Sequence, residues 1–214
     1  MPQQISSAPP DIRRADSAAV HVAQWYVSDR AAGVEALDEA VQQWRATAWP
    51  AGILSFSAYL STEHDTVLTY VQTAGGGVHR AFTAGLKGLA GAETVEYTLH
   101  RAIVLDAAAP APASFVVASF DVDGPGPQES IVASIAGALE HAPAGQHPGM
   151  ISANFHLSTD GTRVLNYAEW TSDEAHIAFL DGATRVATLR ATHATPGVRP
   201  IGFKRYHLLH SLTA

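Results

Sequence analysis

Two hydrogen-bond donors lie on one face of a predicted strand, residues 164–170. Side chains alternate along a strand, so Asn166 and Trp170 point to the same side, together with the apolar Val164 and Ala168. At ~3.3 Å per residue the two donors are ~13 Å apart, about the length of a fused tricyclic aromatic system. An amide N–H and an indole N–H can stabilise a developing enolate or phenolate oxygen, as oxyanion holes do. The strand therefore indicates a site for an aromatic anion.

Neighbouring segments add polar groups to this strand. Along residues 152–157, Asn154 and His156 alternate with apolar side chains, and a favourable register places both near Asn166. Arg190 shares a helical side with His193 and adds a positive charge that favours an anion. These residues predict a mostly apolar pocket with a few donors, suited to an aromatic anion.

The chain contains an internal duplication. Residues 52–72 align without a gap with residues 149–169, at an offset of 97, and eight of the 21 aligned positions are identical. Residues 20–28 and 115–123 match in alternation, as do 95–105 and 203–212 more loosely. Thr69 stands opposite Asn166 and Thr73 opposite Trp170, so the first copy lacks the two donors. We therefore expect one competent pocket, in the second half, with the first half supplying a sheet.

Each half has the predicted order strand, helix, strand, strand, helix, strand. Apolar residues three and four apart predict helices within 34–44 and 131–139. Asp160-Gly161 predicts a hairpin turn, and Thr171 with Glu174 predicts a capping box at a helix start. This order is the ferredoxin-like motif. The expected fold class is α+β, with two tandem ferredoxin-like repeats forming an intramolecular dimeric α+β barrel.

The domain boundaries follow from composition and from the duplication. Residues 1–17 have no apolar periodicity and are expected to form a disordered tail. Residues 18–105 form the degenerate first repeat, and residues 114–214 form the second repeat, which carries the site. Residues 106–113, with two prolines among small residues, are expected to be a short stiff linker.

Composition excludes several function classes. The 13 basic and 20 acidic residues give a net charge of −7, which disfavours a nucleic-acid partner. The absence of Cys excludes thiolate nucleophiles and disulfides. The 11 His residues include no HExxH motif, so no metal site is expected. No apolar run is long enough to span a bilayer and no signal peptide is visible, so we expect a cytoplasmic protein without a membrane partner.

Residues 158–170, STDGTRVLNYAEW, resemble the antibiotic biosynthesis monooxygenase family in the pattern STDGTxVxNYAxW. Residues 115–128 and 148–176 extend the likeness, which covers the second 100 residues and reaches the first 100 only through the duplication. The resemblance implies a ligand cavity between a sheet and its own helices. It also implies a monooxygenase without cofactors that oxidises an aromatic polyketide phenol or anthrone to a quinone with molecular oxygen.

The resemblance assigns roles to particular residues. It implies that His176 replaces a family Tyr, and that Phe155 stands where near relatives have Tyr. A His can still move a proton, with a pKa nearer neutrality than that of Tyr. The implied catalytic residues are Asn166, Trp170, His176 and Arg190, and the expected substrate-binding residues are Asn154, Phe155, His156 and Phe179.

Two other functions remain open from the sequence. The duplicated barrel can bind an aromatic intermediate, or assist a partner enzyme of a polyketide pathway, without turnover. A haem-degrading oxygenase of the same fold calls for an Asn on the first strand of the second half, where this chain offers Phe120 and Asp121. The sequence also leaves open whether two chains associate beyond the intrachain pseudo-dimer.

Overall fold

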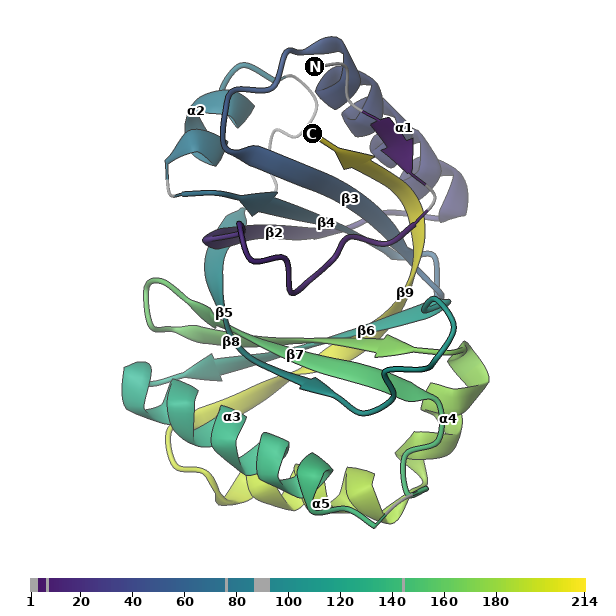
Figure 1. Cartoon of the computed structure of the whole chain (residues 1–214), viewed down its shortest axis with the longest axis vertical. Helices are drawn as coiled ribbons and strands as arrows, with labels where there is room; N and C mark the ends of the chain where they lie inside the picture. Colours follow the sequence, from purple (N-terminus) through teal and green to yellow (C-terminus); the bar gives the residue numbers. More distant parts are fainter. Residues whose placement is uncertain (1–3, 7, 76, 87–92, 144) are drawn as a thin grey trace. The chain divides into compact units, whose positions relative to one another are not determined.

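The computed structural model describes residues 4–6, 8–75, 77–86, 93–143 and 145–214 (Figure 1). The chain divides into two compact units. Unit 1 comprises residues 1–98 and 206–214, and unit 2 comprises residues 99–205. No helix in the described ranges is long and apolar enough to cross a membrane.

In unit 1, two helices lie on one face of an antiparallel sheet (Figure 1). The first helix begins where the Asp29 carboxylate accepts a hydrogen bond from the backbone N–H of Ala32 at 2.9 Å. Its buried face, Leu37, Val41 and Trp44, follows the predicted helical spacing and packs on the sheet. The elements are β2 (Ala19–Tyr26), α1 (Arg30–Ala46), β3 (Ile53–Ser61), β4 (Thr66–Thr73) and α2 (Val78–Thr83).

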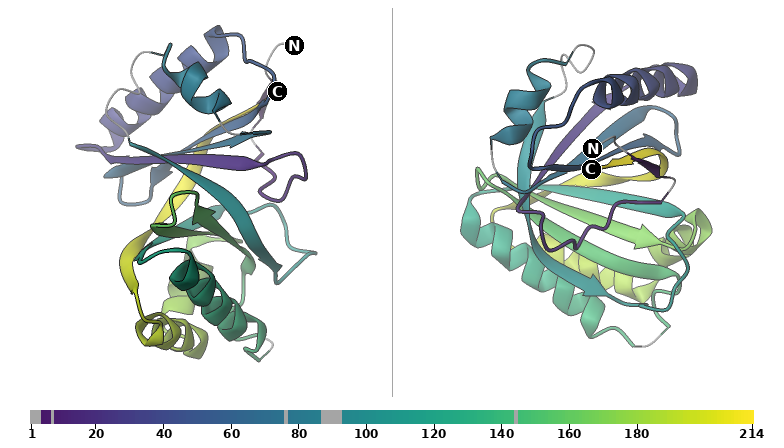
Figure 2. Two further views of the ribbon diagram at one scale, coloured as in Figure 1. Left: turned by 90° about the vertical axis from the view of Figure 1, so that its left-hand side faces the viewer. Right: turned by 45° about the horizontal axis from the view of Figure 1, so that its top comes forward.

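Unit 2 repeats this arrangement with an additional helix. Its helices again cover one face of a sheet, as both views in Figure 2 show. The predicted apolar stripe Ile131, Ile135 and Leu139 is buried against that sheet. The elements are β6 (Ser114–Val122), α3 (Pro125–Glu140), β7 (Met150–Ser158), β8 (Arg163–Trp170), α4 (Asp173–Leu180) and α5 (Ala183–Ala194).

Two long strands, β5 (Thr94–Val104) and β9 (Val198–Thr213), complete the sheets. β5 pairs with β2 and β7, and β9 pairs with β3 and β6. The hydrogen-bonded order β9-β3-β4-β2-β5-β7-β8-β6 returns to its start through the β9–β6 pairing. The predicted fold class, two tandem ferredoxin-like repeats in an α+β barrel, is therefore confirmed.

The predicted boundaries between the repeats differ from those of the structure. β5 passes from unit 1 to unit 2 after residue 98, and β9 passes back after residue 205. Each repeat thus gives half of its last strand to the other unit, because both strands are long enough to pair twice. Residues 106–113 only connect β5 to β6 within unit 2, so they do not separate the domains.

The expectation of a disordered N-terminal tail is also wrong for its described residues. The short strand β1 (Gln4–Ser6) pairs with the end of β9. Ile12 is buried, the carbonyl of Asp11 accepts a hydrogen bond from Gln72 at 2.8 Å, and Arg14 donates to the carbonyl of Leu54. The buried side chains of Pro10 and Ile12 and the pairing with β9 hold the described part of this segment without any periodicity.

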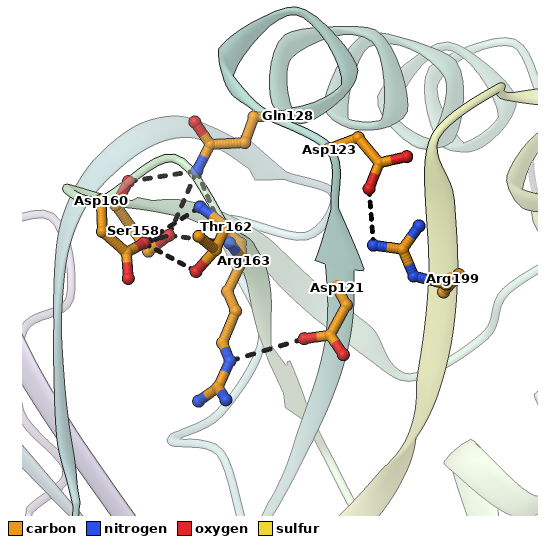
Figure 3. Close-up of polar contacts among 8 residues, drawn as sticks. All are labelled: Asp121, Asp123, Gln128, Ser158, Asp160, Thr162, Arg163 and Arg199. Atoms are coloured by element: carbon orange, nitrogen blue, oxygen red, sulfur yellow. Dashed lines mark hydrogen bonds and ion pairs between the residues drawn. The ribbon is translucent and has the colours of Figure 1, made fainter.

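The turn between β7 and β8 fixes the register of the strand that carries the site (Figure 3). The predicted hairpin is present, with Gly161 at φ 77°. The Asp160 carboxylate accepts hydrogen bonds from the hydroxyls of Ser158 and Thr162. From α3, the buried Gln128 amide donates to the carbonyls of Ser158 and Arg163 at 3.1 and 2.8 Å. The turn is thereby tied to α3.

Replacing Gln128 with methionine is expected to lower the free energy of unfolding by about 1–2 kcal/mol, because the carbonyls of Ser158 and Arg163 each lose one donor, although the Ser158 carbonyl still accepts from the Gly161 N–H. Urea denaturation followed by circular dichroism measures this loss. The matched control is Gln42→Met, on the exposed face of α1. Equal stability of the two variants would show that the Gln128 contacts contribute nothing.

Candidate active site

Unit 2 encloses a cavity of about 120 Å³. One face of the sheet forms one wall and helices α3, α4 and α5 form the other, with residues of β9 at the side. This is the location that the sequence resemblance implied. None of the described residues that line it is acidic. The lining comprises Val116, Ala118, Phe120, Ile135, Leu139, Met150, Asn166, Ala168, Trp170, His176, Phe179, Leu180, Arg185, Thr188, Leu189, Thr192, Pro200, Gly202 and Phe203.

Asn166 and Trp170 both line this cavity, as the strand alternation predicted. Trp170 is 1% exposed, and among the described residues none accepts a hydrogen bond from its indole Nε1. The Oδ1 of the half-buried Asn166 likewise has no donor in the described part of the chain. Buried polar groups are rarely left without partners. The pair can therefore serve a ligand that brings an acceptor to Trp170 and a hydroxyl to Asn166.

His176 reaches the cavity from the first turn of α4. That helix begins at Ser172, whose hydroxyl accepts a hydrogen bond from the backbone N–H of Ala175, and not at the predicted Thr171. The His176 ring lies edge-on to Trp170 at 5.0 Å and to Phe203 at 5.2 Å between centroids. These aromatic contacts fix the imidazole beside the indole donor.

The charge state of His176 follows from its surroundings. Burial, and then the nearby guanidinium groups of Arg205 and Arg185, lower the pKa of His176 to about 4. Arg205 Nη1 lies 3.4 Å from His176 Nδ1. Because a guanidinium can only donate, Nδ1 accepts, and the neutral ring carries its proton on Nε2. His176 is therefore an N–H donor near neutral pH and a poor base.

The positive charge at the cavity is Arg185, and the prediction of Arg190 is wrong. Arg190 is exposed and does not line the cavity. On α5 the residues that line the cavity are Arg185, Thr188, Leu189 and Thr192, at i, i+3, i+4 and i+7. Arg190 is five residues from Arg185, which at 100° per residue rotates it by roughly 140°. The buried residues of α5 are Thr184, Thr188 and Thr192, so no apolar pattern marks this face in the sequence.

Exchanging each of these arginines for glutamine gives a matched pair on one helix. Arg185→Gln is expected to lower kcat/KM by about 10- to 100-fold, because the guanidinium offsets negative charge on the substrate in a mostly apolar cavity. Arg190→Gln is expected to leave it within about twofold, as a solvent-exposed charge. Steady-state kinetics of both variants measure the difference. The opposite ranking would restore the assignment made from sequence.

Asn154 and His156 lie on the other face of the sheet, so their predicted proximity to Asn166 is wrong. The register pairs Asn154 with Tyr167, whereas Phe155 lies opposite Asn166. The Asn154 amide donates to Ser152 and to the carbonyl of Tyr167, at 2.8 and 3.0 Å. Burial lowers the pKa of His156 to about 4, so that ring is neutral.

The two predicted phenylalanines have different environments. Phe179 lines the cavity, as expected of a substrate-binding residue. Phe155 is fully buried in the core on the cavity side of the sheet and does not reach the cavity wall. The Arg185 guanidinium lies 5.8 Å from the ring centroid of Phe203, a cation–π contact at the cavity wall. Phe203 and Arg205 were not among the predicted residues, because both lie on β9, far along the chain from β8.

The fold is that of solved proteins described as anthrone oxidase-like or as related to antibiotic biosynthesis monooxygenases. A solved anthrone oxidase-like protein superimposes with a TM-score of 0.73 at 16% identity, covering 94% of each chain. A ferredoxin-fold protein of Listeria monocytogenes, described as related to antibiotic biosynthesis monooxygenases, gives 0.51 at 11% identity, covering 90% of this chain and 95% of the other. Both likenesses concern the fold.

In sequence, the chain is similar to tetracenomycin-F1 monooxygenase of Streptomyces glaucescens. The two are 43% identical over 53 residues, which are 25% of this chain and 36% of the relative. The match thus spans about a third of the relative's length. No family model matches the chain.

Proposed function

We propose that this protein is a monooxygenase that oxidises an electron-rich aromatic polyketide, of the phenol or anthrone type, to a quinone. The observation that supports this most is the buried indole N–H of Trp170, which lies in the wall of a mostly apolar cavity and has no acceptor in the described part of the chain. A planar substrate whose oxygen becomes an anion supplies that acceptor. Arg185 and the Nε2–H of His176 then lie on the same side as the developing charge.

The reaction begins with loss of a phenolic proton or of the acidic ring C–H. Because His176 is a poor base, this proton leaves to water. The anion gives one electron to O2, and the resulting radical and superoxide combine to form a C–O bond. Protonation gives a hydroperoxide on the ring carbon. Loss of water from it leaves the carbonyl, so that one CH2 and one O2 yield one C=O and one H2O. The protein contributes position and fixed N–H dipoles.

The cavity must enlarge to admit such a substrate. Its volume of about 120 Å³ is below the ~300–1,000 Å³ usual for ligand pockets. Phe203 is 39% exposed and lies at the cavity wall against Arg185. We expect Phe203 to move outward when a tricyclic ligand enters, which would also release the guanidinium to meet the anion.

Oxygen uptake tests this proposal directly. With 1,8-dihydroxyanthrone, chelator present and no added flavin or NAD(P)H, we expect one O2 consumed for each quinone formed, well above autoxidation. A protein that only binds an aromatic intermediate would shift the ligand spectrum, with or without oxygen, and would leave uptake at the autoxidation rate. That result would favour the accessory role and exclude the oxygenase.

A further inference from the structure

The duplication extends further than the aligned strands. At the same offset of 97, His79 corresponds to His176, Phe82 to Phe179, and Gly85 to Gly182. Both histidines lie early in the helix that follows the sheet, and both are buried. The first repeat thus keeps the imidazole of the second, although it lacks the Asn and Trp.

Unit 1 also encloses a cavity, of about 260 Å³, between its sheet and its helices. Its wall includes Thr69 and Val71, which correspond to Asn166 and Ala168 of the unit 2 cavity. The expectation that the first repeat only supplies a sheet therefore needs revision. The lining comprises His21, Ala23, Trp44, Phe56, Thr69, Val71, His79, Arg80, Thr83, Ala84, Leu86 and Thr94.

Two stacked imidazoles form part of this wall. His21 occupies the position of Val116 in the second repeat, at an offset of 95. Its ring lies 4.1 Å from that of His79 with an angle of 7° between the planes. Burial lowers the pKa of His79 to about 3. Beside them, Trp44 stacks on Phe56 at 4.4 Å. The cavity therefore offers several flat ring surfaces.

The polar groups at this cavity include a hydrogen-bond donor and a cation. Trp44 is fully buried, yet among the described residues none accepts a hydrogen bond from its Nε1. The neighbouring Trp49, by contrast, donates its indole N–H to the carbonyl of Trp44 at 2.8 Å. Arg80 is exposed at the cavity and brings a positive charge. None of the described lining residues is acidic.

We propose that unit 1 contains a second binding site, which takes a planar aromatic anion of one or two rings. The rings of His21, His79, Trp44 and Phe56 enclose the aromatic part. The carboxylate or phenolate oxygen accepts the Trp44 N–H and lies toward Arg80. The site is chemically distinct from that of unit 2, whose described lining includes one imidazole, that of His176, and its existence does not depend on oxygenase activity.

The indole N–H signals of the four tryptophans distinguish the two cavities, because Trp44 lines the cavity of unit 1 and Trp170 lines that of unit 2. In a ¹H–¹⁵N correlation spectrum, each signal is assigned from one Trp→Phe variant, and the protein is titrated with 2-naphthoate. We expect the Trp44 signal to move downfield as its proton gains an acceptor, while that of Trp25, which lines neither cavity, stays in place. No movement of the Trp44 signal at millimolar 2-naphthoate would overturn the proposal.

Substitutions at the two cavities show which of them binds 2-naphthoate. Trp44→Phe removes the donor and is expected to weaken 2-naphthoate binding about tenfold. If Trp44→Phe fails to fold, Arg80→Gln, at an exposed position, is expected to weaken it about threefold. Trp170→Phe should leave the shift of the Trp44 signal unchanged. Loss of that shift in Trp170→Phe, or an equal shift with the neutral 2-naphthamide, would contradict a unit 1 anion site.

Discussion

Replacing Trp170 with phenylalanine is expected to lower kcat by about 100- to 1,000-fold, the usual loss when one oxyanion donor is removed. The side chain keeps most of its apolar contacts with His176 and Phe179, because phenylalanine retains a ring. KM should change much less, since the N–H matters most when negative charge develops on the substrate. Initial rates of oxygen uptake over a substrate range separate the two constants.

Trp25→Phe is the matched control for this prediction, because Trp25 is only half-buried and lines neither cavity. It should retain wild-type kcat. If Trp170→Phe has the same kcat as wild type while its circular dichroism and melting temperature are also unchanged, the indole N–H stabilises no anion, and the proposed mechanism is wrong.

Acid should destabilise this protein strongly between pH 6.5 and pH 4. Burial lowers the pKa of His79 to about 3, and of His156 and His176 to about 4, from an ordinary value of 6.5. The unfolded chain binds these protons below pH 6.5 and the folded chain does not, so stability is full above pH 6.5 and falls with pH. Each ring contributes at most about 1.4 kcal/mol per pH unit, so the loss by pH 5 amounts to several kcal/mol.

Urea denaturation at pH 7.5 and at pH 5.0 measures this loss. In His156→Gln one titrating ring is absent, so the difference between the two pH values should shrink by about 2 kcal/mol, whatever the variant's absolute stability. His193→Gln, on the exposed side of α5, serves as the control. A pH dependence of His156→Gln equal to that of wild type would show that His156 is protonated in the folded protein.

Strand periodicity and the internal duplication were sufficient to predict most of the fold from the sequence. Alternation alone placed Asn166 and Trp170 on one face, because successive side chains of a strand must point to opposite sides. The Asp160-Gly161 turn marked the hairpin, and the repeated order of elements predicted two ferredoxin-like units. Each of these signals is local, or depends on comparing the chain with itself.

Other features depend on how distant segments pack. The register of β7 against β8 put Phe155, not Asn154, opposite Asn166, although the sequence permits either pairing. The rotation of α5 selected Arg185 over Arg190, because helix rotation depends on the neighbours that bury one face.

The sequence by itself determined the repeats, the strand faces and the indole donor at Trp170, since these follow from covalent order and backbone periodicity. Only the tertiary structure showed that Arg205, on β9, donates to the imidazole of His176, or that His21 and His79 stack near Trp44, whose indole N–H has no acceptor among the described residues. Those contacts join residues far apart in the chain, and their geometry depends on packing that no local pattern encodes.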